Sequence, residues 1–128
     1  MTGSINLAES KEQTRHEQLE RRMLIFAADV IRKLDKHKSL PRSTVDQLTR
    51  SSASIGANYA EACNAASKLD FRNKIFIAKK EAAETRYWID LVIELTQGES
   101  WKSCRQESHE LLTILQSIIN TLKGTSAK

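Results

Sequence analysis

The residues whose spacing comes closest to a chemical site are two carboxylates, Glu81 and Glu84. They lie three positions apart, so on a helix both would point to the same side. Such a pair is a weak metal signal, because a metal centre in a helical bundle also needs histidines at helical spacing. His16, His37 and His109 are scattered along the chain and have no such neighbours. We therefore predict no metal, no cofactor and no catalytic residue.

Polar residues also occur where a helical segment should face its core. The segment that follows Arg50 is rich in serine and carries Asn58 on the expected inner side. We predict that Asn58 and Glu81 are buried and share hydrogen bonds with serines or Arg50, because a buried carboxylate needs such partners. Two interpretations stay open, a binding site or a structural network that sets helix register. The predicted network comprises Arg50, Ser51, Ser54, Asn58, Glu61, Glu81 and Glu84.

Small residues at steps of four, Ser52, Gly56 and Ala60, form a second feature of the same segment. Glycine inside a helix costs about 1 kcal/mol relative to alanine, so something should compensate for Gly56. Close helix packing within one protomer and a contact between subunits are both consistent with this pattern. A surplus apolar line around Trp88 favours a subunit contact further along the chain. The predicted interface residues are Ser52, Gly56, Ala60, Tyr87, Trp88 and Leu91.

The charge is mildly basic, with a formal net charge of +4 and an isoelectric point near 9.2. Between Lys68 and Lys80 five basic residues face a single acidic one, Asp70. Such asymmetry is typical of a surface that contacts a polyanion, although the charge could also only keep the protein dispersed. The predicted nucleic-acid contacts are Lys68, Arg72, Lys74, Lys79, Lys80 and Arg86, with Arg21, Arg22, Arg32 and Lys33.

Apolar residues at alternating steps of three and four run through the chain and would position these side chains. The clearest stripe runs from Phe71 to Val92, and another runs from Cys104 to Leu122. This spacing keeps one side of a helix against one partner over its whole length. Short joints make sequential helices antiparallel neighbours. The sequence therefore predicts an all-α fold, an antiparallel up-down-up-down four-helix bundle.

Punctuation residues predict where the helices begin and end. The expected helices span about 16–36, 41–66, 71–96 and 103–124. Residues 1–13 are predicted to be a flexible polar N-terminal tail, 14–124 the bundle and 125–128 a C-terminal tail. The expected signals are Pro41 at the start of the second helix, Ser67 or Asp70 as the cap of the third, Gly98 as its terminator, and Ser103 with Gln106 as a capping box for the fourth.

Composition places the chain among ordinary globular proteins. It has 128 residues, of which 40% are hydrophobic and 28% are charged, enough for one domain with its own core. Cys63 and Cys104 are far apart and lie on helical stripes, as expected of buried thiols in a reducing compartment. The N-terminal segment lacks an apolar signal core, and no apolar run is long enough to span a membrane. We therefore predict a cytoplasmic protein.

The stretch from Leu40 to Leu91 resembles a bacterial family of small four-helix-bundle proteins, often encoded by intervening sequences within 23S ribosomal RNA genes. The resemblance is carried by Leu40-Pro41, Arg50-Ser51, Ser54-Ile55-Gly56-Ala57-Asn58, Glu61-Ala62, Ser67-Lys68, Asp70-Phe71, Lys80-Glu81-Ala82, Glu84-Thr85 and Tyr87-Trp88. It implies a ring-like homopentamer. It also extends to the accessory variability determinant of diversity-generating retroelements, which implies a basic surface that binds nucleic acid and a reverse transcriptase.

These observations favour one function and leave an alternative. We predict a non-catalytic, oligomeric helical-bundle protein that binds RNA, DNA or a nucleoprotein partner through its mildly basic surface. Phosphate contacts should dominate, because no aromatic platform for base stacking is visible. The alternative is a structural scaffold or protein-interaction ring with no nucleic-acid role. A metal or small-ligand enzyme would require further partners for Glu81 and Glu84.

Overall fold

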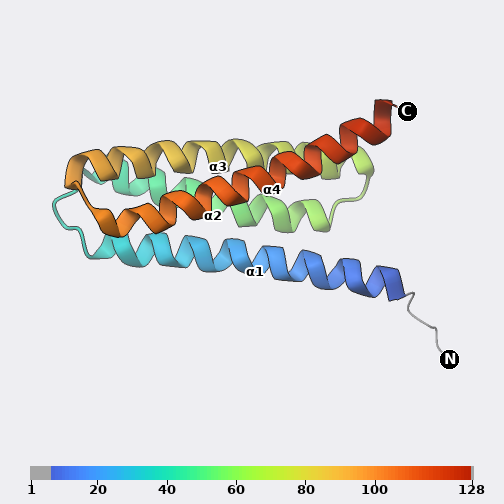
Figure 1. Ribbon diagram of the computed structural model, residues 1–128, viewed down its shortest axis with the longest axis horizontal. Coiled ribbons are helices and arrows are strands. Elements are labelled where there is room, and N and C mark those ends of the chain that lie inside the picture. The colour runs from blue at the N-terminus through green and yellow to red at the C-terminus, as the bar shows by residue number, and fades with distance from the viewer. Residues whose placement is uncertain (1–6, 128) are drawn as a thin grey trace.

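In the computed structural model, which describes residues 7–127 and the side chains of residues 7–124, the chain forms four long helices (Figure 1). They are α1 (Leu7–Asp35), α2 (Arg42–Cys63), α3 (Lys68–Thr96) and α4 (Lys102–Ala127), with a short 3₁₀ helix, η1 (Glu99–Trp101), before α4. The described residues contain no strand. The predicted all-α, up-down-up-down bundle is therefore confirmed.

The core is built from one face of each helix, as the stripes predict. On α3 the predicted stripe is buried from Ile75 to Val92, and only its first residue, Phe71, is half-buried. On α2 Tyr59 is buried in place of Asn58, although the next predicted position, Ala62, is buried as expected, and on α4 Ile119 is buried in place of Ile118. A straight helix has 3.6 residues per turn, so a strict seven-residue pattern drifts by about 20° per repeat. The buried face therefore rotates gradually along each helix, and a residue next to a predicted one can take the inner position.

The helices pack unevenly around the core. The most extensive packing is between α2 and α3, followed by α3 with α4 and α1 with α2. Among the four long helices, the seam between α1 and α4 is the least extensive, and α1 and α3 lie diagonally opposite without a close approach of their backbones. Figure 1 shows α4 diverging from α1 toward the end where both chain termini lie. A groove lies along this seam nearer its other end, beside the first turns of α4.

The helix boundaries differ from the prediction at several ends. The first helix begins at Leu7 rather than near His16, so residues 7–13 are helical, while residues 1–6 lie outside the described part. The second helix ends at Cys63, before the predicted Ala66, and the fourth continues past Gly124 to Ala127. Exposed polar residues such as those before His16 can extend a helix without contributing to an apolar stripe, which is why the pattern does not detect them.

The caps of α3 explain how its two ends are set. The backbone amide of Asp70 donates to Ser67 Oγ at 3.0 Å, so Ser67 is the N-cap, one of the two predicted candidates. At the other end Gln97, not Gly98, has the left-handed conformation, with φ 52°. A Cβ on Gly98 would lie 2.9 Å from Thr96 Oγ1, so this glycine is needed for space rather than for its backbone angle.

The start of α4 is anchored by an aromatic residue instead of the predicted capping box. The helix begins at Lys102, so Ser103 lies inside its first turn. Just before it, Trp101 is fully buried and its Nε1 donates to His37 Nε2 at 3.3 Å. The Lys33 ammonium lies 5.9 Å from the centre of the indole ring. Trp101 therefore ties the α3–α4 connection to the end of α1.

Candidate nucleic-acid interface

The acidic pair singled out from the sequence forms a polar cluster between α2 and α3. Arg50 donates from Nη1 to both carboxylate oxygens of Glu81 at 3.1 Å, and its Nη2 pairs with Glu84. The indole Nε1 of Trp88 donates to Glu84 Oε2 at 2.9 Å. This indole hydrogen bond, followed by Arg50, lowers the pKa of Glu84. The two carboxylates are thus engaged by protein groups, which favours a structural role for the pair.

The other residues of the predicted network do not join this cluster. Ser51 is buried and accepts a hydrogen bond from Thr85 Oγ1 at 2.9 Å, which links α2 to α3. Asn58 is half-buried, and its amide donates to the Ser54 carbonyl of its own helix at 2.8 Å. The predicted pairing of Glu81 with Arg50 is present, but Asn58 and Glu81 are only half-buried and do not share one network, because the inner position of α2 passes to Tyr59. Ser54 itself bonds to the Arg50 carbonyl, and Glu61 pairs with Lys74 at 2.8 Å.

No unsatisfied group in this region points to a ligand. Among the described residues, every buried side-chain nitrogen and oxygen has a hydrogen-bond partner. The described part of the chain also holds no group of three or more His, Cys, Asp or Glu residues that could bind a metal ion. The contacts between α2 and α3 therefore support the interpretation of the polar residues as a network that sets register.

The residues predicted for a subunit interface fall into two environments. Ser52 is fully buried inside the protomer, so it is not available to a second subunit. A Cβ added to Gly56 would lie 3.1 Å from Met23 Cβ, so this glycine allows α1 to approach α2 closely. The small-residue stripe is thus explained within one protomer, and Ala60 is half-buried beside it. On α3, by contrast, Tyr87 is 61% exposed and stacks edge-on against Trp88, with Leu91 half-buried nearby.

The ten basic residues predicted to contact nucleic acid divide into two separate sets, because α1 and α3 are diagonal. On α3, Lys68, Arg72 and Lys80 are exposed, and Lys79 is half-buried. The Arg72 guanidinium lies over the Phe76 ring, and Lys74 is engaged by Glu61. Arg86 contacts His109 of α4 at 3.4 Å. This set therefore forms a basic strip in which two of the six residues already contact titratable side chains of neighbouring helices.

The α1 set lines the groove at the open α1–α4 seam, which has a volume of about 640 Å³. All four predicted α1 residues line it, together with a fifth cation, Lys36, which the sequence analysis did not single out. Two carboxylates, Asp29 and Glu107, also line it. The groove therefore carries a local excess of positive charge. The four predicted residues are Arg21, Arg22, Arg32 and Lys33.

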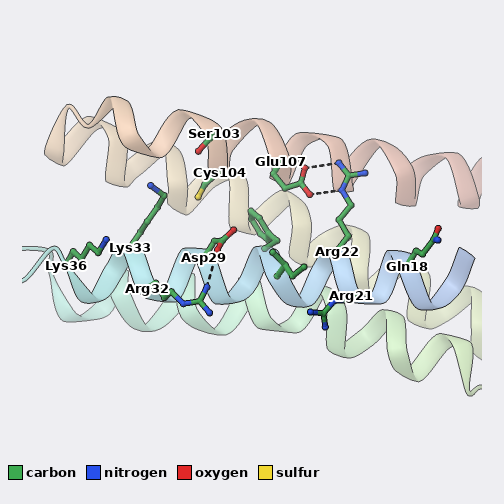
Figure 2. Close-up of a pocket in the computed structure, with 12 residues that line it drawn as sticks. Gln18, Arg21, Arg22, Asp29, Arg32, Lys33, Lys36, Ser103, Cys104 and Glu107 are labelled. Carbon is green, nitrogen blue, oxygen red and sulfur yellow. Dashed lines mark hydrogen bonds and ion pairs between the residues drawn. The ribbon is translucent and has the colours of Figure 1, made fainter. Parts of the chain in front are cut away.

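Two of these cations are engaged by carboxylates and three are not. Arg22 donates from Nε to Glu107 at 2.7 Å and from Nη2 to Glu110 at 2.9 Å, and these contacts raise its pKa, with the hydrogen bond to Glu107 as the largest cause. Arg32 pairs with Asp29 at 3.2 Å within α1. Among the described contacts, Arg21, Lys33 and Lys36 have no ion pair. Figure 2 shows Arg22 and Lys33 extending from α1 toward α4, whereas Arg21 extends on the other side of α1.

The floor of the groove is apolar. It includes Ile25, which is 47% exposed, and the nearly buried Phe26 and Cys104. Burial raises the pKa of the Cys104 thiol, so this cysteine behaves as a small apolar side chain and not as a nucleophile. Ile25 was not predicted, although an isoleucine off the core stripe of α1, with Arg21 and Arg22 one turn before it and Asp29 one turn after it, is a signal that could have found it. A groove with cationic walls and an apolar floor suits a ligand that is anionic in one part and apolar in another.

No helix in the described part of the chain is long and apolar enough to cross a membrane.

Comparison with known proteins gives a family and a structural relative. Residues 18–117 match the family described as 23S rRNA-intervening sequence protein. The fold is similar to the crystal structure of a protein with unknown function from the S23 ribosomal protein family of Bacteroides thetaiotaomicron, with a TM-score of 0.72 and 37% identity. That similarity covers 79% of this chain and 97% of the other. No curated protein matches. The chain therefore belongs to the 23S rRNA-intervening sequence protein family.

Proposed function

We propose that this protein is a non-catalytic, self-associating helical bundle that binds nucleic acid through the α1–α4 groove. The observation that carries the proposal is the set of five cations on α1 against two carboxylates in one groove. Lysine and arginine side chains that neutralise phosphates supply most of the affinity of proteins for nucleic acid. The basic strip at the start of α3 would extend the contact on a diagonal helix. Family membership supports RNA as the polyanion to test first.

Two further features support a cytoplasmic location and self-association. Cys63 and Cys104 are both free thiols, which fits the reducing cytoplasm that we propose for this protein. Exposed apolar residues on α3, with Tyr87 61% and Leu95 52% exposed, support self-association through that helix. We propose a ring of five copies, and the number five comes from the family resemblance alone. In a ring, one modest basic surface is repeated, so several weak contacts add through effective concentration.

The test compares two matched triple variants by fluorescence anisotropy with a labelled RNA at a series of salt concentrations. Replacing Arg21, Lys33 and Lys36 by glutamine should weaken binding and flatten the salt dependence, by about 0.7 of a log–log unit per lost phosphate contact on a single strand. Replacing Arg72, Lys79 and Lys80 removes the same charge from α3 and should have the smaller effect. Absence of binding by the parent at low salt would contradict the proposal.

A protein-interaction scaffold is the second candidate, and the exposed apolar residues of α3 favour it. In that case the parent would assemble normally but bind neither RNA nor DNA at low salt. A sizing column run beside each titration separates the two candidates, because a charge variant that only disturbs assembly would change its elution volume. Circular dichroism of both variants provides the control for folding.

A further inference from the structure

The groove between α1 and α4 combines an apolar floor with cationic walls, and a nucleic-acid duplex could contact the walls but not the floor. We propose that it binds unpaired nucleotides, with a base against its apolar floor and the backbone phosphates on its cationic walls. This inference rests on the proposed function and names its substrate class, single-stranded nucleic acid. It adds a requirement for exposed base faces, which phosphate binding alone does not have.

The floor supplies the first argument. Ile25 is 47% exposed, while its neighbour Phe26 is 3% exposed and belongs to the core. An apolar side chain gains nothing from a phosphate, but it gains by covering the face of a base. In a duplex the base faces are stacked against one another, whereas in a single strand they can turn outward onto a protein surface. Of the two forms of nucleic acid, only an unpaired strand can therefore use the apolar floor.

The walls supply the second argument. The positions of Arg22 and Lys36 are separated by roughly 21 Å along the helix axis at 1.5 Å per residue. Lys33 and Lys36 lie three positions apart on the same side of α1, and neither has an ion pair among the described contacts. Cations distributed along this length can meet successive phosphates of an extended strand. Contacts of this kind fix the position of the backbone without reading its sequence.

The ion pair across the groove argues for a flexible occupant. Arg22 reaches from α1 to Glu107 on α4 with two hydrogen bonds, at 2.7 and 2.8 Å, and so bridges the groove (Figure 2). An acidic helix is about 10 Å wide and rigid, so it could not lie along the groove without breaking this bridge. A single strand can bend around the bridge and insert a base on one side of it. The geometry therefore favours unpaired nucleotides over an acidic amphipathic helix.

The test uses the full-length protein with two labelled RNAs of equal length, one unstructured and one paired as a duplex. We expect the parent to bind the unstructured strand about tenfold more tightly at equal salt. Ile25→Ala should lower the affinity for the single strand about fivefold, without changing duplex binding or the salt dependence of either complex. Leu24→Ala is the matched control, because Leu24 is adjacent on α1, is 62% exposed, and lines a different groove against α2.

Each outcome decides between the inference and the proposed function. Equal or tighter binding of the duplex, or equal effects of Ile25→Ala and Leu24→Ala, would overturn the inference while the proposed function stands. Failure of the parent to bind either RNA would overturn both. If an acidic amphipathic peptide binds the parent, loses affinity in Ile25→Ala, and neither RNA binds, the groove is a peptide site. Circular dichroism and a sizing column establish that both variants fold and assemble like the parent.

Discussion

At the scale of single residues, Arg22 is the most restrained of the five cations in the groove. Glu107 and Glu110 engage it from α4, and Gln106 in turn donates to Glu110 at 3.1 Å. Hydrogen bonds from Gln106 and Arg22, in that order, lower the pKa of Glu110, so this carboxylate stays charged. A guanidinium held in this way has fewer free donors for a phosphate. The pair of carboxylates therefore limits how strongly the groove binds an anion.

Releasing Arg22 should strengthen binding if the proposed function holds. We expect the double variant Glu107→Gln with Glu110→Gln to bind RNA more tightly and to gain about 0.7 of a log–log unit in salt dependence, the value for one additional phosphate. Anisotropy titrations over a salt series measure both. The control, Glu9→Gln with Glu94→Gln, removes the same charge from exposed positions that have no ion pair among the described contacts.

A double-mutant cycle separates a specific release of Arg22 from a general change in charge. Arg22→Gln should lower the affinity less in the parent, where only a charge already engaged by carboxylates is lost, than in the released background, where a phosphate contact is lost as well. If the effects of Arg22→Gln and of the double glutamine variant on the binding free energy are additive, the two carboxylates act only through the net charge of the groove.

Glu84 gives a pH-dependent contribution to stability. Its pKa lies below its ordinary value of 4.5, first because Trp88 donates to it and then because Arg50 is adjacent. The folded state therefore binds this proton less tightly than the unfolded state. The contribution is complete above pH 4.5 and is lost as the pH falls through the lowered folded value. The thermal unfolding temperature of the parent should therefore decrease as the pH is lowered through this acidic range.

The variant Glu84→Gln should show a smaller decrease across the same pH range, because it has no proton to bind there. Glu94→Gln, an exposed carboxylate of the same helix, should keep the decrease of the parent. Identical pH profiles for the parent and Glu84→Gln would contradict the assigned role of the Trp88 hydrogen bond.

At the scale of elements, the close approach of α1 to α2 depends on Gly56. Met23 is fully buried, so its Cβ cannot retreat unless α1 moves with it. We expect Gly56→Ala to destabilise the fold by about 1 kcal/mol net, because overpacking outweighs the gain in helix propensity. Denaturant unfolding followed by circular dichroism measures this difference in the free energy of unfolding.

Gly124 is the matched control for this prediction. Nothing lies within 4 Å of a Cβ added there, so Gly124→Ala should be neutral or slightly stabilising. If both substitutions change the free energy of unfolding in the same direction and by the same amount, the close packing of α1 on α2 does not explain Gly56.

The elements also show what the sequence could predict and what it could not. The α3 stripe from Ile75 to Val92 was predictable, because buried alanine and isoleucine at steps of three and four define one face. The exchange of Asn58 for Tyr59 was not, because a seven-residue pattern ignores the drift of a straight helix. The basic groove depends on the packing of α1 against the first turns of α4, which is a property of the folded chain. Single-chain patterns contain charges but not the separation between the helices that carry them.

At the scale of the whole molecule, the exposed part of α3 should be covered by another copy. Ile77, Tyr87 and Leu95 are 39%, 61% and 52% exposed along one helix. We expect a homo-oligomer at micromolar concentration in analytical ultracentrifugation, with five copies as the proposed number. Tyr87→Glu should shift the distribution toward smaller species, because it places a charge in a contact that must lose water.

The matched control for assembly is Leu24→Glu, which places the same charge on the exposed part of α1. A stable monomer of the parent at micromolar concentration would contradict self-association. Equal effects of the two glutamate variants would instead indicate that the interface does not lie on α3.

The short seam between α1 and α4 has a consequence for the time order of synthesis. A ribosome completes α1 first, yet this helix has only α2 as an extensive partner, while α2, α3 and α4 pack successively on one another. The first helix to leave the ribosome therefore packs on α2 alone until Trp101 has been synthesised. Trp101 then donates its hydrogen bond to His37, which follows α1 in the chain. During that time Leu24 and Ile25, which stay exposed even in the folded bundle, are open to contact with other nascent chains. Copies translated side by side on one messenger could thus meet before any of them has finished folding.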